Sequence, residues 1–127
     1  MRLFLVRHAE AAPGDPDELR PLTAAGRDAA RELAERLAAE QLEAVVSSPL
    51  LRARETAVAI AEASGIEPET DDRLAPGATA DDVRGVVAGK GATVVAVGHQ
   101  PDCSEIFFAL TGEEVDFPVG SFHEVVL

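Results

Sequence analysis

The sequence contains no tryptophan, no tyrosine and a single cysteine, Cys103, among its 127 residues. One cysteine excludes an intrachain disulfide framework and is typical of a reducing compartment. The N-terminal apolar run, Leu3–Val6, is far too short for a signal peptide or a membrane span. We therefore expect a cytoplasmic protein, folded as one domain over residues 1–127 around a core of Val, Leu, Ile and Ala.

Basic residues are also scarce. Eleven Lys and Arg residues face 23 Asp and Glu residues, so the formal net charge is −12. A surface this acidic repels nucleic acid and anionic membranes, and we expect neither as a partner. It would repel a phosphate group as well, unless some of the arginines gathered at one place. The positions of the few arginines are therefore informative.

Four short apolar runs predict β-strands. They are aliphatic on both faces, which is typical of strands covered by helices on both sides. The predicted strands are Leu3–Val6, Ala44–Val46, Thr93–Val97 and Val125–Leu127. The sequence leaves the direction of the last strand open. The stretch from Gly65 to Gly77 is rich in Pro, Gly and Asp, and predicts a connection with one short extended piece.

Four helices are predicted between these strands, each with a recognisable first or last residue. In chain order they run from the N-cap Thr23 to about Ala39, from the N-cap Ser48 and Pro49 to Ser64 before Gly65, onward from Thr79, and from Pro101 to near Gly112. Strands that alternate with helices predict an α/β fold. We expect a three-layer domain with a mainly parallel sheet flanked by helices on both faces.

Polar residues follow three of the predicted strands. In open α/β sheets, ligands bind where the carboxyl ends of the strands meet. The residues at these ends are Arg7 and His8 after the first strand, Ser48 and Arg52 after the second, and Gly98 and His99 after the third. Two histidines and two arginines are therefore expected at the same edge of the sheet.

This combination favours phosphoryl transfer. The planar guanidinium of arginine binds two phosphate oxygens at once, and a helix start near Ser48 adds unpaired amide donors. A neutral imidazole can attack phosphorus and hold the phosphoryl group covalently. Arg7 and Arg52 would disfavour the protonated form of a nearby imidazole. A second histidine can stabilise the charge of the transition state.

Three segments resemble motifs of the histidine phosphatase superfamily. Leu5–Glu10 resembles its Arg-His-Gly signature, with Ala9 in place of the glycine, and Ser47–Ala57 resembles its Ser-Pro motif with a following arginine. Val97–Pro101 resembles the motif with the second histidine. The stretch Arg20-Pro21-Leu22-Thr23 also matches, particularly in the short phosphohistidine-phosphatase branch (SixA type).

The resemblance implies a role for each matching residue. His8 would be the phosphorylated nucleophile, with His99 as its partner histidine. Arg7 and Arg52 would be the phosphate clamps. Further phosphate or substrate contacts would come from Arg20, Ser48 and Gly98.

The resemblance also implies a reaction. The chain would hydrolyse a phosphorylated substrate, protein phosphohistidine, through a phosphohistidine intermediate on His8, without a cofactor. A small phosphate ester is an alternative substrate. A non-catalytic phosphate-recognition module is another alternative, because no residue in 71–76 matches the acidic proton donor of larger relatives. We expect no metal, because two guanidinium groups disfavour a neighbouring cation and no ligand cluster accompanies the histidines.

The remaining candidates have simpler interpretations. Cys103 lacks the arginine six residues later that a cysteine phosphatase needs, since Ala109 stands there, and we expect Cys103 to fill the core. His123 is expected to be structural. Glu10 and Asp102 are in reach of the predicted site for proton transfer, but we interpret both as solvated loop charges.

Overall fold

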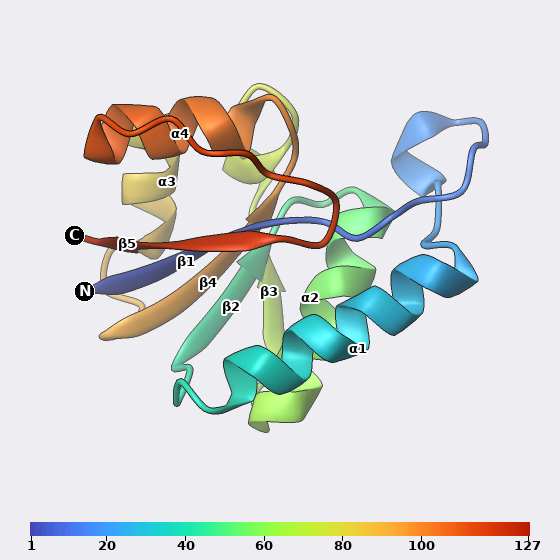
Figure 1. Cartoon of the computed structure of the whole chain (residues 1–127), viewed down its shortest axis with the longest axis horizontal. Helices are drawn as coiled ribbons and strands as arrows, with labels where there is room; N and C mark the ends of the chain where they lie inside the picture. Colours follow the sequence, from blue (N-terminus) through green and yellow to red (C-terminus); the bar gives the residue numbers. More distant parts are fainter.

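Five strands form one sheet in the order β3-β2-β4-β1-β5 (Figure 1). Their bounds are Arg2–Arg7 (β1), Ala44–Ser47 (β2), Pro68–Thr70 (β3), Thr93–Gly98 (β4) and Phe122–Val126 (β5). Neighbours among β1 to β4 pair in parallel, whereas β5 runs antiparallel to β1. The computed structural model describes all residues, 1–127. The mainly parallel sheet is confirmed, but β5 begins at Phe122 and not at the predicted Val125.

The helices are α1 (Ala24–Ala38), α2 (Leu51–Ser64), α3 (Ala80–Val87) and α4 (Asp102–Thr111), with short 3₁₀ turns η1 (Asp17–Leu19) and η2 (Asp72–Leu74). Thr23 caps α1 as predicted, since its side chain accepts from the Gly26 N–H. Thr79 forms a capping box with Asp82 at the start of α3. Gly65 ends α2 in the left-handed conformation that glycine adopts without a steric penalty.

The predicted start of the second helix is wrong. The helix begins at Leu51, its N-cap is Leu50, and no side chain caps it. The backbone of Ser48 continues the strand, because its N–H donates to Val97 O at 3.0 Å. Its hydroxyl lies 2.7 Å from Nε2 of His99. Arg52 is therefore the second residue of α2 and lies in its first turn.

The two faces of the sheet are covered by different helices, and β1 illustrates the division (Figure 1). Phe4 and Val6 pack in a cluster with residues of α1 and α2. Leu3 and Leu5 pack on the opposite face with residues of α3 and α4. Successive strand residues point to opposite faces, so a strand that is apolar throughout is buried on both sides. The three-layer architecture is confirmed. No helix has the length and apolarity needed to cross a membrane.

The connection between β1 and α1 projects beyond the carboxyl edge of the sheet (Figure 1). It closes on itself through a bridge between Ala11 and Leu22 and a hydrogen bond of 2.8 Å from Ala12 N to Pro21 O. The Arg20 side chain adds a bond of 2.8 Å from Nε to Ala12 O. These contacts hold the turn η1, which the sequence did not predict, above the edge of the sheet.

Candidate active site

The strand register brings the two predicted histidines together. Arg7 of β1 pairs with Gly98 of β4, so the next residues, His8 and His99, leave the sheet side by side. The His8 N–H donates to Gly98 O at 3.1 Å, and the two ring centroids lie 5.1 Å apart. Both residues are buried, with exposed fractions of 9% and 4%. The strands thus place two imidazoles in contact at the carboxyl edge.

His8 is oriented by the backbone of the next residue. Its Nδ1 lies 2.7 Å from Ala9 O. A carbonyl oxygen only accepts, so Nδ1 carries the hydrogen in this bond and Nε2 of the neutral ring holds a lone pair. Nε2 has no hydrogen-bond partner within the protein. The ring is therefore presented in the form that a nucleophile requires.

The pKa of His8 is lowered below the ordinary value of 6.5. Burial is the largest cause, and the charges of Arg52, Arg7 and Arg20 lower it further, while the bond to Ala9 O acts in the opposite direction. The sequence predicted the effect of Arg7 and Arg52 but not that of burial, which is stronger. Both causes favour the neutral imidazole at pH 7.

His99 is held by Ser48, whose Oγ lies 2.7 Å from its Nε2. The other ring nitrogen, Nδ1, is buried and has no partner. Burial, followed by the charges of His8 and Arg52, lowers the pKa of His99 to about 4. His99 is therefore also neutral at pH 7, and one of its ring nitrogens makes no hydrogen bond.

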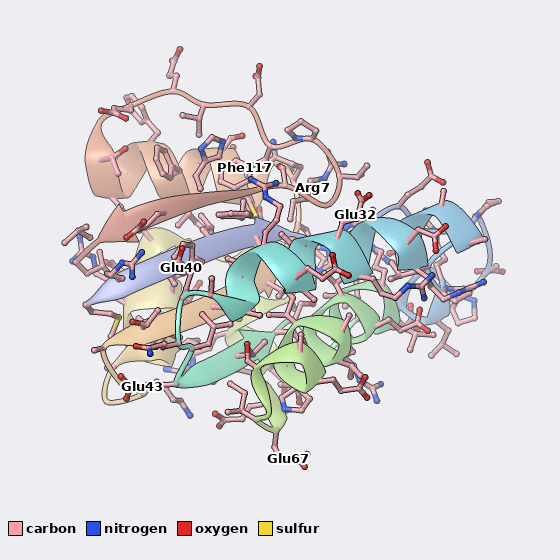
Figure 2. The ribbon with its side chains drawn as sticks, turned by 60° about the horizontal axis from the view of Figure 1, so that its bottom comes forward. Arg7, Glu32, Glu40, Glu43, Glu67 and Phe117 are labelled. Atoms are coloured by element: carbon pink, nitrogen blue, oxygen red, sulfur yellow. The ribbon has the colours of Figure 1, made fainter.

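Both predicted arginines keep donors that no protein atom accepts. Arg52 is buried and donates from Nη1 to Asp17 O at 2.9 Å and from Nη2 to Asp17 Oδ2 at 3.1 Å, which leaves three of its N–H groups unpaired. Arg7 donates from Nη1 to Phe117 O at 2.9 Å (Figure 2), while its buried Nε has no partner. Guanidinium groups with unpaired donors at this edge are suited to bind an anionic ligand.

Thr56 connects the segment after β1 to α2. Its Oγ1 accepts from the Ala9 N–H at 3.1 Å and donates to Arg52 O at 2.8 Å, and the residue is fully buried. Ala9, which replaces the glycine of the superfamily signature, is fully buried as well and packs with Leu22 and Ala30. Its φ is not positive, so the alanine is accommodated without backbone strain.

The three additional residues that the sequence predicted as phosphate contacts have other partners in the structure. Ser48 accepts from the Leu50 N–H at 3.2 Å and contacts His99. Gly98 takes part through its carbonyl, which accepts from His8 N. Arg20 donates to Ala12 O and, from Nη1, to Asp17 Oδ1 at 3.0 Å. Of the three, Arg20 supplies positive charge to the site, since it lowers the pKa of His8.

Other polar candidates lie apart from this edge or are engaged elsewhere. Cys103 is buried, and burial raises the pKa of its thiol to about 12, which excludes a reactive thiolate. Asp102 is buried, and its Oδ2 accepts from the Gly77 N–H at 2.8 Å, so its interpretation as a solvated loop charge is wrong. Glu10 is exposed and accepts from Thr23 Oγ1 at 2.7 Å. No three His, Cys, Asp or Glu side chains are arranged to hold a metal ion.

Sequence reasoning missed two residues of the site, Asp17 and Thr56. Thr56 follows Arg52 by four positions on the same helix, which is a detectable spacing. Asp17 is 35 positions from Arg52, and nothing in the local sequence indicates that the two meet.

A family model described as the histidine phosphatase superfamily (branch 1) matches residues 3–76. The chain belongs to this superfamily. An uncharacterized protein of Picosynechococcus sp. (strain PCC 7002) is 38% identical over 132 residues, covering 91% of this chain and 79% of that protein. Phosphoserine phosphatase 1 of Hydrogenobacter thermophilus is 39% identical over 83 residues, but this match spans only 58% of the chain and 37% of that enzyme.

The superfamily fold extends over the whole chain. The solved structure of the protein histidine phosphatase SixA, complexed with tungstate, superposes with a TM-score of 0.88 at 27% sequence identity. The superposition covers 100% of this chain and 88% of SixA. SixA and phosphoserine phosphatase 1 are phosphatases, and the α/β fold predicted from the sequence is the fold of SixA.

Proposed function

We propose that this superfamily member hydrolyses phosphohistidine on proteins through a covalent phosphohistidine intermediate on His8. The observation that carries the proposal is the pair of buried, neutral histidines 5.1 Å apart beside arginines with unpaired donors. Burial and the neighbouring guanidinium groups keep His8 in its nucleophilic form. The same guanidinium groups match the charge of a phosphate.

The first chemical step is attack on phosphorus by Nε2 of His8. The P–N bond forms on Nε2 while the bond from phosphorus to the leaving group breaks, and its electron pair stays with the leaving group. The ring of His8 becomes cationic, and Nδ1–H remains bonded to Ala9 O, 2.7 Å away in the free protein. Arg7, Arg52 and His99 stabilise the negative charge on the phosphoryl oxygens.

The second step releases phosphate. A water molecule forms a bond to phosphorus, the P–Nε2 bond breaks, and its electron pair returns to Nε2, which restores the neutral ring. The two protons of the water leave with the phosphate product. Burial lowers the pKa of His8, so the neutral ring is a favourable leaving group at pH 7.

The absence of an obvious acid supports phosphohistidine as the substrate. In residues 71–76, where larger relatives have an acidic donor, Arg73 holds the pKa of Asp71 at about 2, so Asp71 has no proton to donate at pH 7. The leaving nitrogen of phosphohistidine needs less help from an acid than an ester oxygen does, because the imidazole ring can be protonated near neutral pH before it leaves. The likeness to SixA, solved with the tetrahedral oxyanion tungstate, supports the same substrate class.

A small phosphate ester is the second candidate substrate. The partial match to phosphoserine phosphatase 1 favours it, over 58% of this chain. The family model, which matches residues 3–76, contains His8 and Arg52. This candidate uses the same nucleophile and differs only in the leaving group.

A release assay separates the candidates. Purified protein is given a histidine-phosphorylated protein and, in parallel, phosphoserine and a panel of sugar phosphates. We expect a far higher kcat/KM for the phosphohistidine protein. A higher value for a small ester would contradict the substrate proposal and leave His8 as the nucleophile. Binding of the phosphoprotein without release would contradict hydrolysis itself and favour a phosphate-recognition module.

A further inference from the structure

Asp17 touches both the candidate phosphate clamp and the loop above it. Its Oδ2 accepts from Nη2 of Arg52 at 3.1 Å, and its Oδ1 accepts from Nη1 of Arg20 at 3.0 Å. Its backbone carbonyl accepts from Nη1 of Arg52 at 2.9 Å. One residue of η1 therefore makes three hydrogen bonds to two arginines at the carboxyl edge of the sheet.

The carboxylate of Asp17 stays accessible despite these contacts. Its side chain is 61% exposed, whereas that of Arg52 is 9% exposed. An ionised carboxylate has about four lone-pair positions, so two remain available after the bonds to Arg20 and Arg52. Asp17 is thus the solvent-exposed partner of Arg52, which is buried in the site.

The same contacts keep Asp17 ionised. Hydrogen bonds from Arg20 and then Arg52 lower the pKa of its carboxyl group. Asp17 also lies close enough to His99 for its charge to raise the pKa of that ring, against the stronger effects that lower it. A carboxylate held in this form has no proton to donate at neutral pH. Its chemical use at the rim is therefore to accept a hydrogen bond from a cationic group.

Phosphohistidine has such a group. One ring nitrogen is bonded to phosphorus, and the other can take up a proton near neutral pH. The protonated ring is cationic. When the P–N bond breaks, its electron pair stays on the departing nitrogen, and the ring leaves as neutral imidazole without receiving another proton. Protonation of the distant nitrogen is thus sufficient activation. An ester oxygen offers no equivalent position for a carboxylate acceptor.

We infer that Asp17 recognises the protonated ring of a phosphohistidine substrate, accepting a hydrogen bond from the ring nitrogen that is not bonded to phosphorus. This inference rests on the proposed function and adds the residue that selects the leaving group. An ionised acceptor stabilises the ring cation and thereby the form of the substrate that reacts. It offers no such stabilisation to a phosphate ester, whose leaving group is uncharged before the reaction.

The test compares Asp17→Asn with Glu18→Gln on two probes, a histidine-phosphorylated peptide and p-nitrophenyl phosphate. Asparagine keeps the size and one oxygen acceptor for the arginines but removes the charge. Because Asp17 also holds Arg52, both activities decrease in Asp17→Asn. We expect kcat/KM for the phosphopeptide to fall by roughly 10-fold more than kcat/KM for p-nitrophenyl phosphate. This difference is the size expected for one lost charge-assisted hydrogen bond. Glu18 is exposed and makes no hydrogen bond, and its variant should keep the wild-type ratio of the two kcat/KM values.

The pH profile gives a second readout that a purely structural role would not change. The charged or titratable groups near Asp17 are Arg20 in its own loop, Arg52 on α2 and His99 after β4. Without the carboxylate, the substrate ring loses its proton at lower pH in the complex. The alkaline limb of kcat for the phosphopeptide should therefore move to lower pH in Asp17→Asn, with no such shift for p-nitrophenyl phosphate.

Two outcomes would decide against the inference. An unchanged ratio in an active Asp17→Asn variant, which means an equal loss on both probes, would exclude recognition of the ring and make Asp17 a positioning residue for Arg52 only. A ratio that falls equally in Glu18→Gln would assign the effect to general surface charge. If the wild-type protein does not release phosphate from the phosphopeptide, the proposed function fails instead.

Discussion

The histidine pair at the carboxyl edge and the histidine on the edge strand β5 illustrate how position decides chemistry. His8 and His99 lie 5.1 Å apart, and the pKa of each is lowered. His123 also packs against rings, at 4.8 Å from Phe117 and 5.4 Å from Phe107, and its Nε2 donates to Asp116 O at 2.9 Å. Ring contacts are thus common to both regions. The two regions differ in position, because His8 and His99 follow the ends of β1 and β4, whereas His123 lies within β5.

Replacement of the two kinds of histidine should give the largest contrast. We expect His8→Ala to reduce kcat by roughly 10⁴-fold or more, because the covalent step loses its nucleophile. His123→Ala should leave kcat nearly unchanged. Steady-state kinetics on a histidine-phosphorylated protein measures both.

Trapping with labelled substrate provides the control for this comparison. Acid-labile phosphate should appear on the wild-type protein and on the His123 variant, and not on the His8 variant. Full activity in His8→Ala, or labelling of another residue, would remove the distinction between the two regions.

The two arginines at the start of α2 sharpen the comparison within one helix. Arg52 is buried at the site, whereas Arg54 is exposed. Arg52→Lys keeps the charge but loses the planar fork, and we expect a loss of roughly 10²–10³ in kcat/KM. Arg54→Lys is the matched control and should retain activity. Equal activity of the two variants would show that Arg52 contributes only its positive charge and not its planar fork.

A smaller effect is expected at the residue that orients His99. Ser48→Ala removes the hydroxyl 2.7 Å from Nε2 of His99, and we expect kcat to fall by roughly 10-fold, the cost of one hydrogen bond of about 1.5 kcal/mol. The matched control is Ser47→Ala, because the Oγ of Ser47 donates to Ser48 O at 2.9 Å and is not hydrogen-bonded to a histidine. If both variants lost activity equally, orientation of His99 would not explain the effect.

The smallest expected effect is on stability. The pKa of His99 is about 4 in the folded chain and 6.5 in an ordinary environment, so the unfolded chain binds this proton first as the pH falls. The free energy of unfolding should therefore decrease between about pH 6.5 and pH 4. Urea unfolding at pH 7 and pH 5 should show a smaller decrease in His99→Gln than in the wild type. Parallel pH dependence of the two proteins would contradict this contribution.

The elements with strong local patterns were predicted correctly. Thr23 caps α1, α3 begins directly after Thr79 and Gly65 ends α2, all as expected, because each of these signals acts within one helical turn. The start of α2 was wrong because Ser48 is engaged by His99, 51 positions away. Asp102 was misjudged for the same kind of reason, since its partner is the backbone of Gly77, 25 positions earlier.

Local sequence patterns were enough to predict that strands alternate with helices and that His8, Arg52 and His99 follow the ends of strands, which in a parallel sheet share one edge. The atoms that these residues contact depend on how the chain folds. The closed loop after β1 brings Asp17 to Arg52. Burial of His8 in the folded chain is the main cause of its lowered pKa. This difference follows from the distance along the chain over which each kind of interaction acts. Backbone preferences act over a few neighbouring residues, whereas hydrogen-bond partners and burial depend on segments that meet only after the chain has folded.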